Sequence, residues 1–99
     1  MATATFDRDE LIALNKQYTQ IMVDWPQVCC EQDVLDKAKA GGRASITTKI
    51  LYDFPGDGPI VVDDAAQDTL KTAAMIEHST EAQNDAYTDG MQEVFDDHS

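Results

Sequence analysis

Residues 44–62 read ASITTKILYDFPGDGPIVV, and the fold class depends on how this stretch is interpreted. In its first part, apolar and β-branched residues alternate with polar ones, which is the two-residue repeat of a half-buried strand. The Pro and Gly residues that follow are the strongest turn signal in the chain, and a short run of strand formers comes after them. The stretch therefore predicts an antiparallel β-hairpin, with strands at about 44–54 and 60–62.

Helical patterns flank this predicted hairpin on both sides. Apolar residues recur at three- and four-residue spacing from Leu11 to Met22, and Trp25-Pro26 ends that pattern because the residue before a proline avoids the helical region. Gly41-Gly42 is a stop signal for a second helix. The sequence therefore predicts an α+β fold, with the hairpin packed among four helical segments at about 7–23, 26–40, 64–78 and 80–97.

Two details at the helix ends add to this prediction. Asp7 with Glu10, and Asp64 with Gln67, have the spacing of capping boxes at the starts of the first and third helices. Ser79-Thr80 either caps a fourth helix or interrupts one long helix, so the pattern leaves open whether residues 64–97 form one helix or two.

Length and composition favour one acidic α+β domain over residues 1–99. The chain is 42% apolar, enough for a modest core, and no stretch approaches the roughly 18 apolar residues of a membrane span. Its first residues lack the basic and apolar regions of a signal peptide. We therefore expect a cytoplasmic protein with no membrane partner.

The charge is distributed unevenly along the chain. The net charge is −12, but residues 1–52 carry seven acids and six bases, whereas residues 53–99 carry twelve acids and one base, Lys71. A surface of this sign repels nucleic acid and anionic membranes. If charge selects a partner, that partner is basic.

Within the acidic half, acids follow one another every four residues from Glu77 to Glu93. Like charges at this spacing on a helix destabilise it slightly, and no Lys or Arg after Lys71 relieves them. Four helical residues rise about 6 Å, which is close to the separation of successive phosphates along a nucleic-acid strand. The predicted partner-binding residues are the acids of this row and its flanks: Asp63, Asp64, Glu77, Glu81, Asp85, Asp89, Glu93, Asp96 and Asp97.

Two functions are consistent with these patterns. The first is a non-enzymatic protein whose acidic C-terminal half binds and inhibits a basic nucleic-acid-binding protein, and mimicry of phosphates is one way for it to do so. Phage anti-restriction proteins, anti-CRISPR proteins and polymerase inhibitors are of this physical type. The alternative is a small structural or adaptor module that uses the hairpin edge or an apolar face, with the acids serving only solubility. Homo-oligomerisation is left open by the sequence.

We expect no catalytic residues, cofactor or metal. The two adjacent cysteines, Cys29 and Cys30, would diverge by about 100° on a helix, which suits neither a disulfide nor a zinc site, and they are interpreted as reduced, small buried side chains. Residues 53–64 only partly match the spacing of a calcium-binding loop, since Pro55 stands at a ligand position. No phosphate-binding loop or metal-binding motif is found in the chain.

Overall fold

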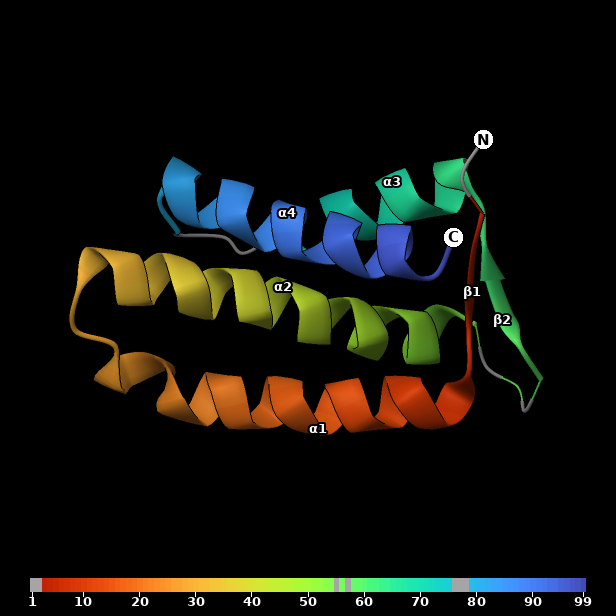
Figure 1. The fold of residues 1–99 in the computed structure, drawn as a ribbon, viewed down its shortest axis with the longest axis horizontal. Helices are drawn as coiled ribbons and strands as arrows, with labels where there is room; N and C mark the ends of the chain where they lie inside the picture. The colour runs from red at the N-terminus through yellow and green to blue at the C-terminus, as the bar shows by residue number, and fades with distance from the viewer. Residues whose placement is uncertain (1–2, 55, 57, 76–78) are drawn as a thin grey trace.

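The computed structural model describes residues 3–54, 56, 58–75 and 79–99. It has an α+β fold, as predicted, with four α-helices and one pair of antiparallel strands (Figure 1). In chain order the elements are strand β1 (Ala4–Phe6), helix α1 (Arg8–Asp24), the 3₁₀ turn η1 (Trp25–Gln27), helix α2 (Glu31–Asp53), strand β2 (Ile60–Val62), helix α3 (Asp64–Ala73) and helix α4 (Glu81–Asp97).

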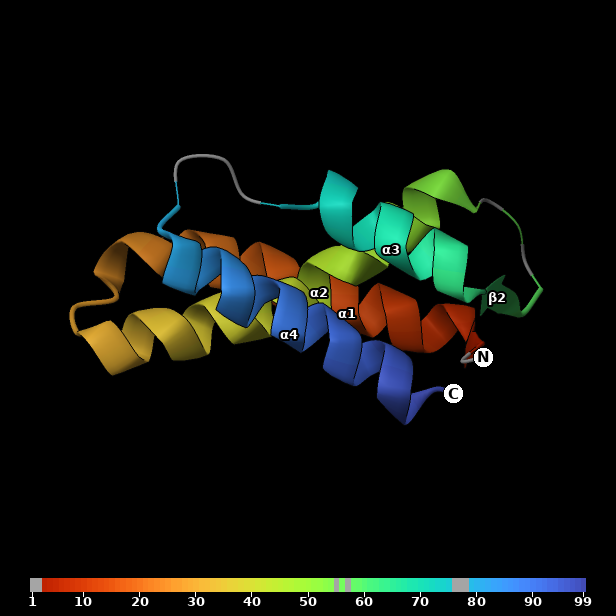
Figure 2. The ribbon, with the colours of Figure 1, turned by 90° about the horizontal axis from the view of Figure 1, so that it is seen from above.

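Helix α2 is the central element. It packs against α1 on one side and against α4 on another, and the strand pair closes one end of the helical layers (Figures 1 and 2). In the strand pair, Ala4 lies opposite Val62 and Phe6 lies opposite Ile60. These four side chains are buried and join the core with residues of α2 and α4, including Ile46, Ile50, Met91 and Phe95.

The segment predicted as the first hairpin strand is helical, and that part of the prediction is wrong. Residues 44–53 form the second half of α2, and the true partner of β2 is β1, from the start of the chain. The sequence of this segment lacks the single apolar stripe of a surface helix because α2 lies between two other helices and is buried on both sides. Its buried residues include the polar Ser45 and Thr47 as well as Ala44, Ile46 and Ile50.

The glycine pair predicted to stop the second helix instead lies inside α2, so this prediction is also wrong. A Cβ added to Gly42 would lie 2.0 Å from the carbonyl oxygen of Tyr87, and one added to Gly90 would lie 2.1 Å from that of Lys39. Both distances are too short for any side chain. These two glycines are therefore required where the backbones of α2 and α4 cross.

The other helix limits differ from the predictions by small amounts, with two exceptions. Helix α1 and helix α4 begin one residue later than predicted, whereas the second helix begins at Glu31 after η1 and a short link rather than at residue 26. A capping box joins Thr80 and Gln83, so α3 and α4 are separate helices. Helix α3 ends at Ala73, before the predicted residue 78: residues 74–75 are not helical, and residues 76–78 lie outside the described residues.

The two predicted capping boxes are not formed. Asp7 occupies the N-cap of α1, but its side chain makes no capping hydrogen bond. At α3 the cap is one residue earlier than predicted: Asp63 accepts a hydrogen bond of 2.8 Å from the backbone nitrogen of Ala66. Among the described residues, no helix is both long and apolar enough to cross a membrane.

The C-terminal end of α4 is tied to the start of the chain. The backbone nitrogen of Thr5 donates to the carbonyl oxygen of His98 at 3.1 Å, and the His98 ring stacks on Phe6 with centroids 4.4 Å apart. The imidazole also contacts the carbonyl oxygen of Val94 and the carboxylate of Glu10, at 2.8 and 3.1 Å. Residues from both ends of the chain therefore complete one side of the core.

Candidate functional site

The acidic residues predicted from the sequence lie mainly on α4. Glu81, Asp85 and Asp89 are exposed and follow the outer side of this helix, since Tyr87, Met91 and its other buried residues face the core. Within the described part of the chain, no Lys, Arg or His side chain forms an ion pair with any of the three acids. We call these three residues the α4 ridge.

Glu93, the next acid in the row, has a different environment. The row drifts by about 40° per step around the helix, and at this position it meets α2. The carboxylate of Glu93 pairs with Lys39 at 2.5 Å and with the guanidinium of Arg43. These two cations hold the pKa of the Glu93 carboxyl below its usual value, with Lys39 contributing most. Glu93 therefore joins two helices and adds no free charge to the surface.

The remaining predicted residues are separated from the ridge. Asp63 and Asp64 are exposed at the start of α3, at the end of the molecule opposite to Glu81 (Figure 1). Asp96 and Asp97 are exposed in the last turn of α4, and Asp96 accepts a hydrogen bond of 2.9 Å from Gln92. Glu77 lies outside the described residues. The structure thus divides the predicted set into a ridge and two smaller acidic sites.

The fold adds acids that the sequence prediction did not include. The first turns of α2 and of α4 lie at the same end of the molecule in both views (Figures 1 and 2). Asp36 and Asp85 are respectively six and five residues before the crossing glycines, so both lie roughly 8–9 Å along their helices from the crossing point. Three exposed acids of α2 therefore join this end: Glu31, Asp33 and Asp36.

A signal for these missed residues was present in the sequence. Residues 24–36 contain four acids and no base. The near-neutral balance of the first half of the chain hid this cluster, because the bases of α2 lie further along the helix. Two of these bases, Lys39 and Arg43, form ion pairs with Glu93. The excess of negative charge at this end therefore comes from both halves of the chain.

Part of this acidity has a local structural role. Glu31, Asp33 and Glu81 lie in the first turns of their helices, where negative charge is stabilised by the helix dipole. Asp85 and Asp89 are beyond the first turn of α4 and gain no such stabilisation. They are spaced four residues apart from each other and from their neighbours, which is unfavourable on a helix.

The cysteines are placed differently from the prediction. Cys29 and Cys30 are exposed, free thiols in the non-helical link between η1 and α2, so their interpretation as buried side chains in a helix is wrong. The Asp33 carboxylate, which accepts a hydrogen bond from Cys30, raises the pKa of that thiol to about 11, and Cys29 adds to the effect. A thiol with a raised pKa is a poor nucleophile at neutral pH.

Comparison with known proteins finds no matching family model, no significantly similar curated protein and no significantly similar solved structure. The functional argument therefore rests on the residues described above.

Proposed function

We propose that this protein is a non-enzymatic, cytoplasmic inhibitor that binds a basic nucleic-acid-binding protein through the acidic end of α4 and α2. Its physical type is that of the phage anti-restriction, anti-CRISPR and polymerase inhibitors that place carboxylates where their targets expect phosphates. The bound partner would release counterions, as it does when it binds nucleic acid.

One observation carries this proposal. The exposed acids of the α4 ridge lie without cation partners in the described structure, at the same end of the molecule as the acidic first turns of α2. Asp85 and Asp89 lower the stability of α4 through their like charges, and neither lies at a capping position of the helix. A surface that served solubility alone would need neither the repetition on one helix nor the convergence of two acidic segments.

The ridge also limits how phosphate mimicry can work. From Glu81 to Asp89 the carboxylates rise by about 12 Å and rotate by about 80° around the helix, and the next step brings Glu93 against its two cations. Three carboxylates on α4 therefore supply one short row, and those of α2 supply a second. The surface fits a groove that contacts a few phosphates, rather than a long channel.

The experiment is a pull-down from cell lysate with the intact protein and the triple variant Glu81→Gln/Asp85→Asn/Asp89→Asn, washed at low and high salt. We expect the intact protein to retain a DNA- or RNA-binding protein that elutes at high salt and competes with nucleic acid. The triple variant should lose most of this binding, since interactions with desolvated charges contribute several kcal/mol.

A matched control removes the same number of charges elsewhere. Asp7→Asn/Asp9→Asn/Asp68→Asn neutralises three exposed acids at the start of α1 and on α3. Binding should survive in this control. If both variants bind equally well, the ridge is not the interface; if both lose binding equally, the partner responds to net charge and not to this surface.

The adaptor function has one observation in its favour, at the outer edge of β2. Thr5 bonds to His98 on the side away from β2, so Thr5 and Val61 form the non-hydrogen-bonded pair of the ladder. The backbone N–H and C=O of Val61 therefore point outward, beside a side chain that is 57% exposed. A second strand could add there. A stable oligomer that Val61→Pro disrupts, and that the ridge variant leaves intact, would favour this function.

A further inference from the structure

The link between η1 and α2 brings two thiols into contact. The sulfur atoms of Cys29 and Cys30 are 3.0 Å apart, and both side chains are exposed. This contact arises because Cys30 is the N-cap of α2 and has an extended backbone, with φ −119° and ψ 157°. The argument that adjacent cysteines diverge holds only on a helix, and here it does not apply.

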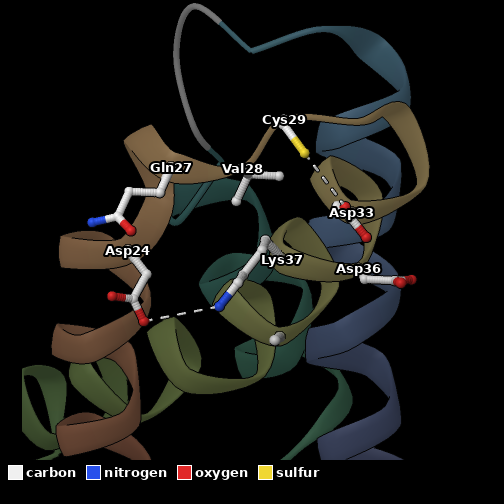
Figure 3. A pocket seen from close by; sticks show the side chains of 8 residues that line it. Asp24, Gln27, Val28, Cys29, Asp33, Asp36 and Lys37 are labelled. Carbon is white, nitrogen blue, oxygen red and sulfur yellow. Dashed lines mark hydrogen bonds and ion pairs between the residues drawn. The ribbon is translucent and has the colours of Figure 1, made fainter.

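A carboxylate completes the group. Oδ2 of Asp33, in the first turn of α2, is 3.0 Å from the sulfur of Cys30 and 3.9 Å from that of Cys29. Figure 3 shows Cys29 and Asp33 pointing toward one another at the mouth of an open pocket, which Asp24, Asp36 and Lys37 also line. Three donor atoms from five consecutive residues therefore meet on the surface, all within 4.8 Å of one another.

We propose that Cys29, Cys30 and Asp33 form a binding site for a thiophilic divalent cation, Zn²⁺, with water in the fourth position. This site shares Asp33 with the acidic surface of the proposed function, but cation binding by its three donor atoms does not depend on that function. Thiolate sulfur and carboxylate oxygen are both ordinary zinc ligands, and sites with three protein ligands keep one position open.

The separations of the donor atoms fit this ion. Tetrahedral zinc, with bonds of about 2.3 Å to sulfur and 2.1 Å to oxygen, places two sulfurs about 3.8 Å apart and each sulfur about 3.6 Å from the oxygen. The observed values are 3.0 Å between the sulfurs, and 3.0 and 3.9 Å to the oxygen. Each differs from the required distance by less than 1 Å. All three side chains are exposed, so they are free to rotate toward these distances.

The surrounding charges also favour a cation. The cation that lines the pocket, Lys37, is directed to Asp24 at 4.0 Å (Figure 3), whereas Asp36 accepts a hydrogen bond of 2.9 Å from Gln32. Zn²⁺ binding would release the protons of both thiols to solvent, and the ion would then leave one of the three negative charges of two thiolates and one carboxylate. That remaining charge lies at the N-terminus of a 23-residue helix, where the dipole stabilises it.

The test is titration of the reduced protein with Zn²⁺ by calorimetry, and with Cd²⁺ by ultraviolet absorption, in a phosphine reductant. We expect one ion per chain and a thiolate-to-cadmium charge-transfer band. Cys29→Ser and Cys30→Ser should each abolish the band. Asp33→Asn should weaken Zn²⁺ binding at least about tenfold, since even outer-sphere partners of metal ligands are worth that much.

Two controls separate this site from general attraction to an acidic surface. Asp36→Asn makes the same charge change one turn further along α2 and should alter the affinity less than about threefold, and Glu81→Gln/Asp85→Asn/Asp89→Asn should leave the charge-transfer band unchanged. Zn²⁺ binding that survives Cys30→Ser, or that falls equally in Asp33→Asn and Asp36→Asn, would overturn the proposal. So would thiol titration showing that the two cysteines are joined as a disulfide under these reducing conditions.

Discussion

Gly41 and Gly42 are neighbours in the sequence with different surroundings in the fold. A Cβ on Gly41 would lie 3.6 Å from Ile21 of α1, an ordinary contact, whereas a Cβ on Gly42 would lie 2.0 Å from the backbone of α4. Gly41 therefore faces side chains of both neighbouring helices at ordinary distances, since its Cβ would also lie 4.0 Å from the Tyr87 ring, whereas Gly42 faces the backbone of α4. Only Gly42 is required for the close approach of two backbones.

This difference predicts opposite effects for two similar substitutions. Gly42→Ala should destabilise the protein by about 3 kcal/mol or more, because the methyl group forces α2 and α4 apart. Gly41→Ala should be neutral or stabilising by about 0.5–1 kcal/mol, since alanine is the better helix former. Urea unfolding followed by circular dichroism measures both. Equal stability of the two variants would mean that the helices do not cross at Gly42.

Tyr87 predicts how stability depends on alkaline pH. Burial raises the pKa of its phenol to about 12, partly offset by a hydrogen bond with Ser45. Because the folded protein holds the neutral phenol more firmly than the unfolded chain, this contribution is complete below pH about 10 and is lost as pH rises toward 12.

Tyr87→Phe should therefore reduce the fall in unfolding free energy between pH 8 and pH 12 by on the order of 2–3 kcal/mol. Unfolding free energies measured from pH 8 to 12 test this, with Tyr52→Phe as the control because Tyr52 is 80% exposed. If the unfolding free energies of the intact protein and of Tyr87→Phe fall equally with rising pH, Tyr87 is not the cause of the loss of stability at alkaline pH.

At the scale of elements, the sequence predicted the ends of α1 and α4, the strand at residues 60–62 and the α+β class, but not the second half of α2. Local sequence patterns predict an element correctly where only one of its faces is buried, as in α1. They fail for residues 44–53, where packing on two sides buries the polar Ser45 and Thr47 together with Ile46. The pairing of β2 with β1 joins segments more than fifty residues apart, and local patterns carry no information on such a contact.

The acidic site was predicted in part for the same reason. The spacing of Glu81, Asp85 and Asp89 was visible along the chain, and the contribution of the α2 acids was not, because it depends on how two helices cross. The neutralisation of Glu93 was equally hidden, since Lys39 and Arg43 are about fifty residues away in sequence.

The ion pairs of Glu93 predict an acid-dependent link between α2 and α4. The pKa of Glu93 is lowered in the folded protein, so its contribution to stability is present above the unfolded value near 4.3 and is lost as pH falls below it. Glu93→Gln should be less stable than the intact protein at pH 7, and this difference should shrink as the pH falls.

Asp89→Asn is the matched control for this effect. It removes the preceding acid of the same row, which has no cation partner in the described structure, and should leave stability at pH 7 unchanged or slightly higher. Thermal unfolding at pH 3, 5 and 7 compares the three proteins. A similar loss at pH 7 in both variants would show that the pairing with α2 contributes nothing specific.

For the molecule as a whole, the net charge of −12 opposes the folded state by self-repulsion. Added NaCl should raise the melting temperature as it screens the acids. The variant Glu81→Gln/Asp85→Asn/Asp89→Asn should melt higher at low salt and respond less to NaCl. Calorimetric scans from 0.01 to about 0.5 M NaCl, a range over which the screening length falls several-fold, test this. Equal salt responses would indicate that repulsion is not concentrated on the α4 ridge.

The contact of β1 with the end of α4 determines when the chain can fold during its synthesis. Phe6 leaves the ribosome early, but its partners Phe95 and His98 are among the last of these residues to be translated. The nascent chain must therefore emerge with Phe6, Ala4 and much of the α2 surface unprotected, and it can complete its core only after residue 98 has cleared the exit tunnel. Until then these apolar surfaces stay exposed to solvent, and exposed apolar surface of this kind makes an incompletely folded chain prone to aggregation.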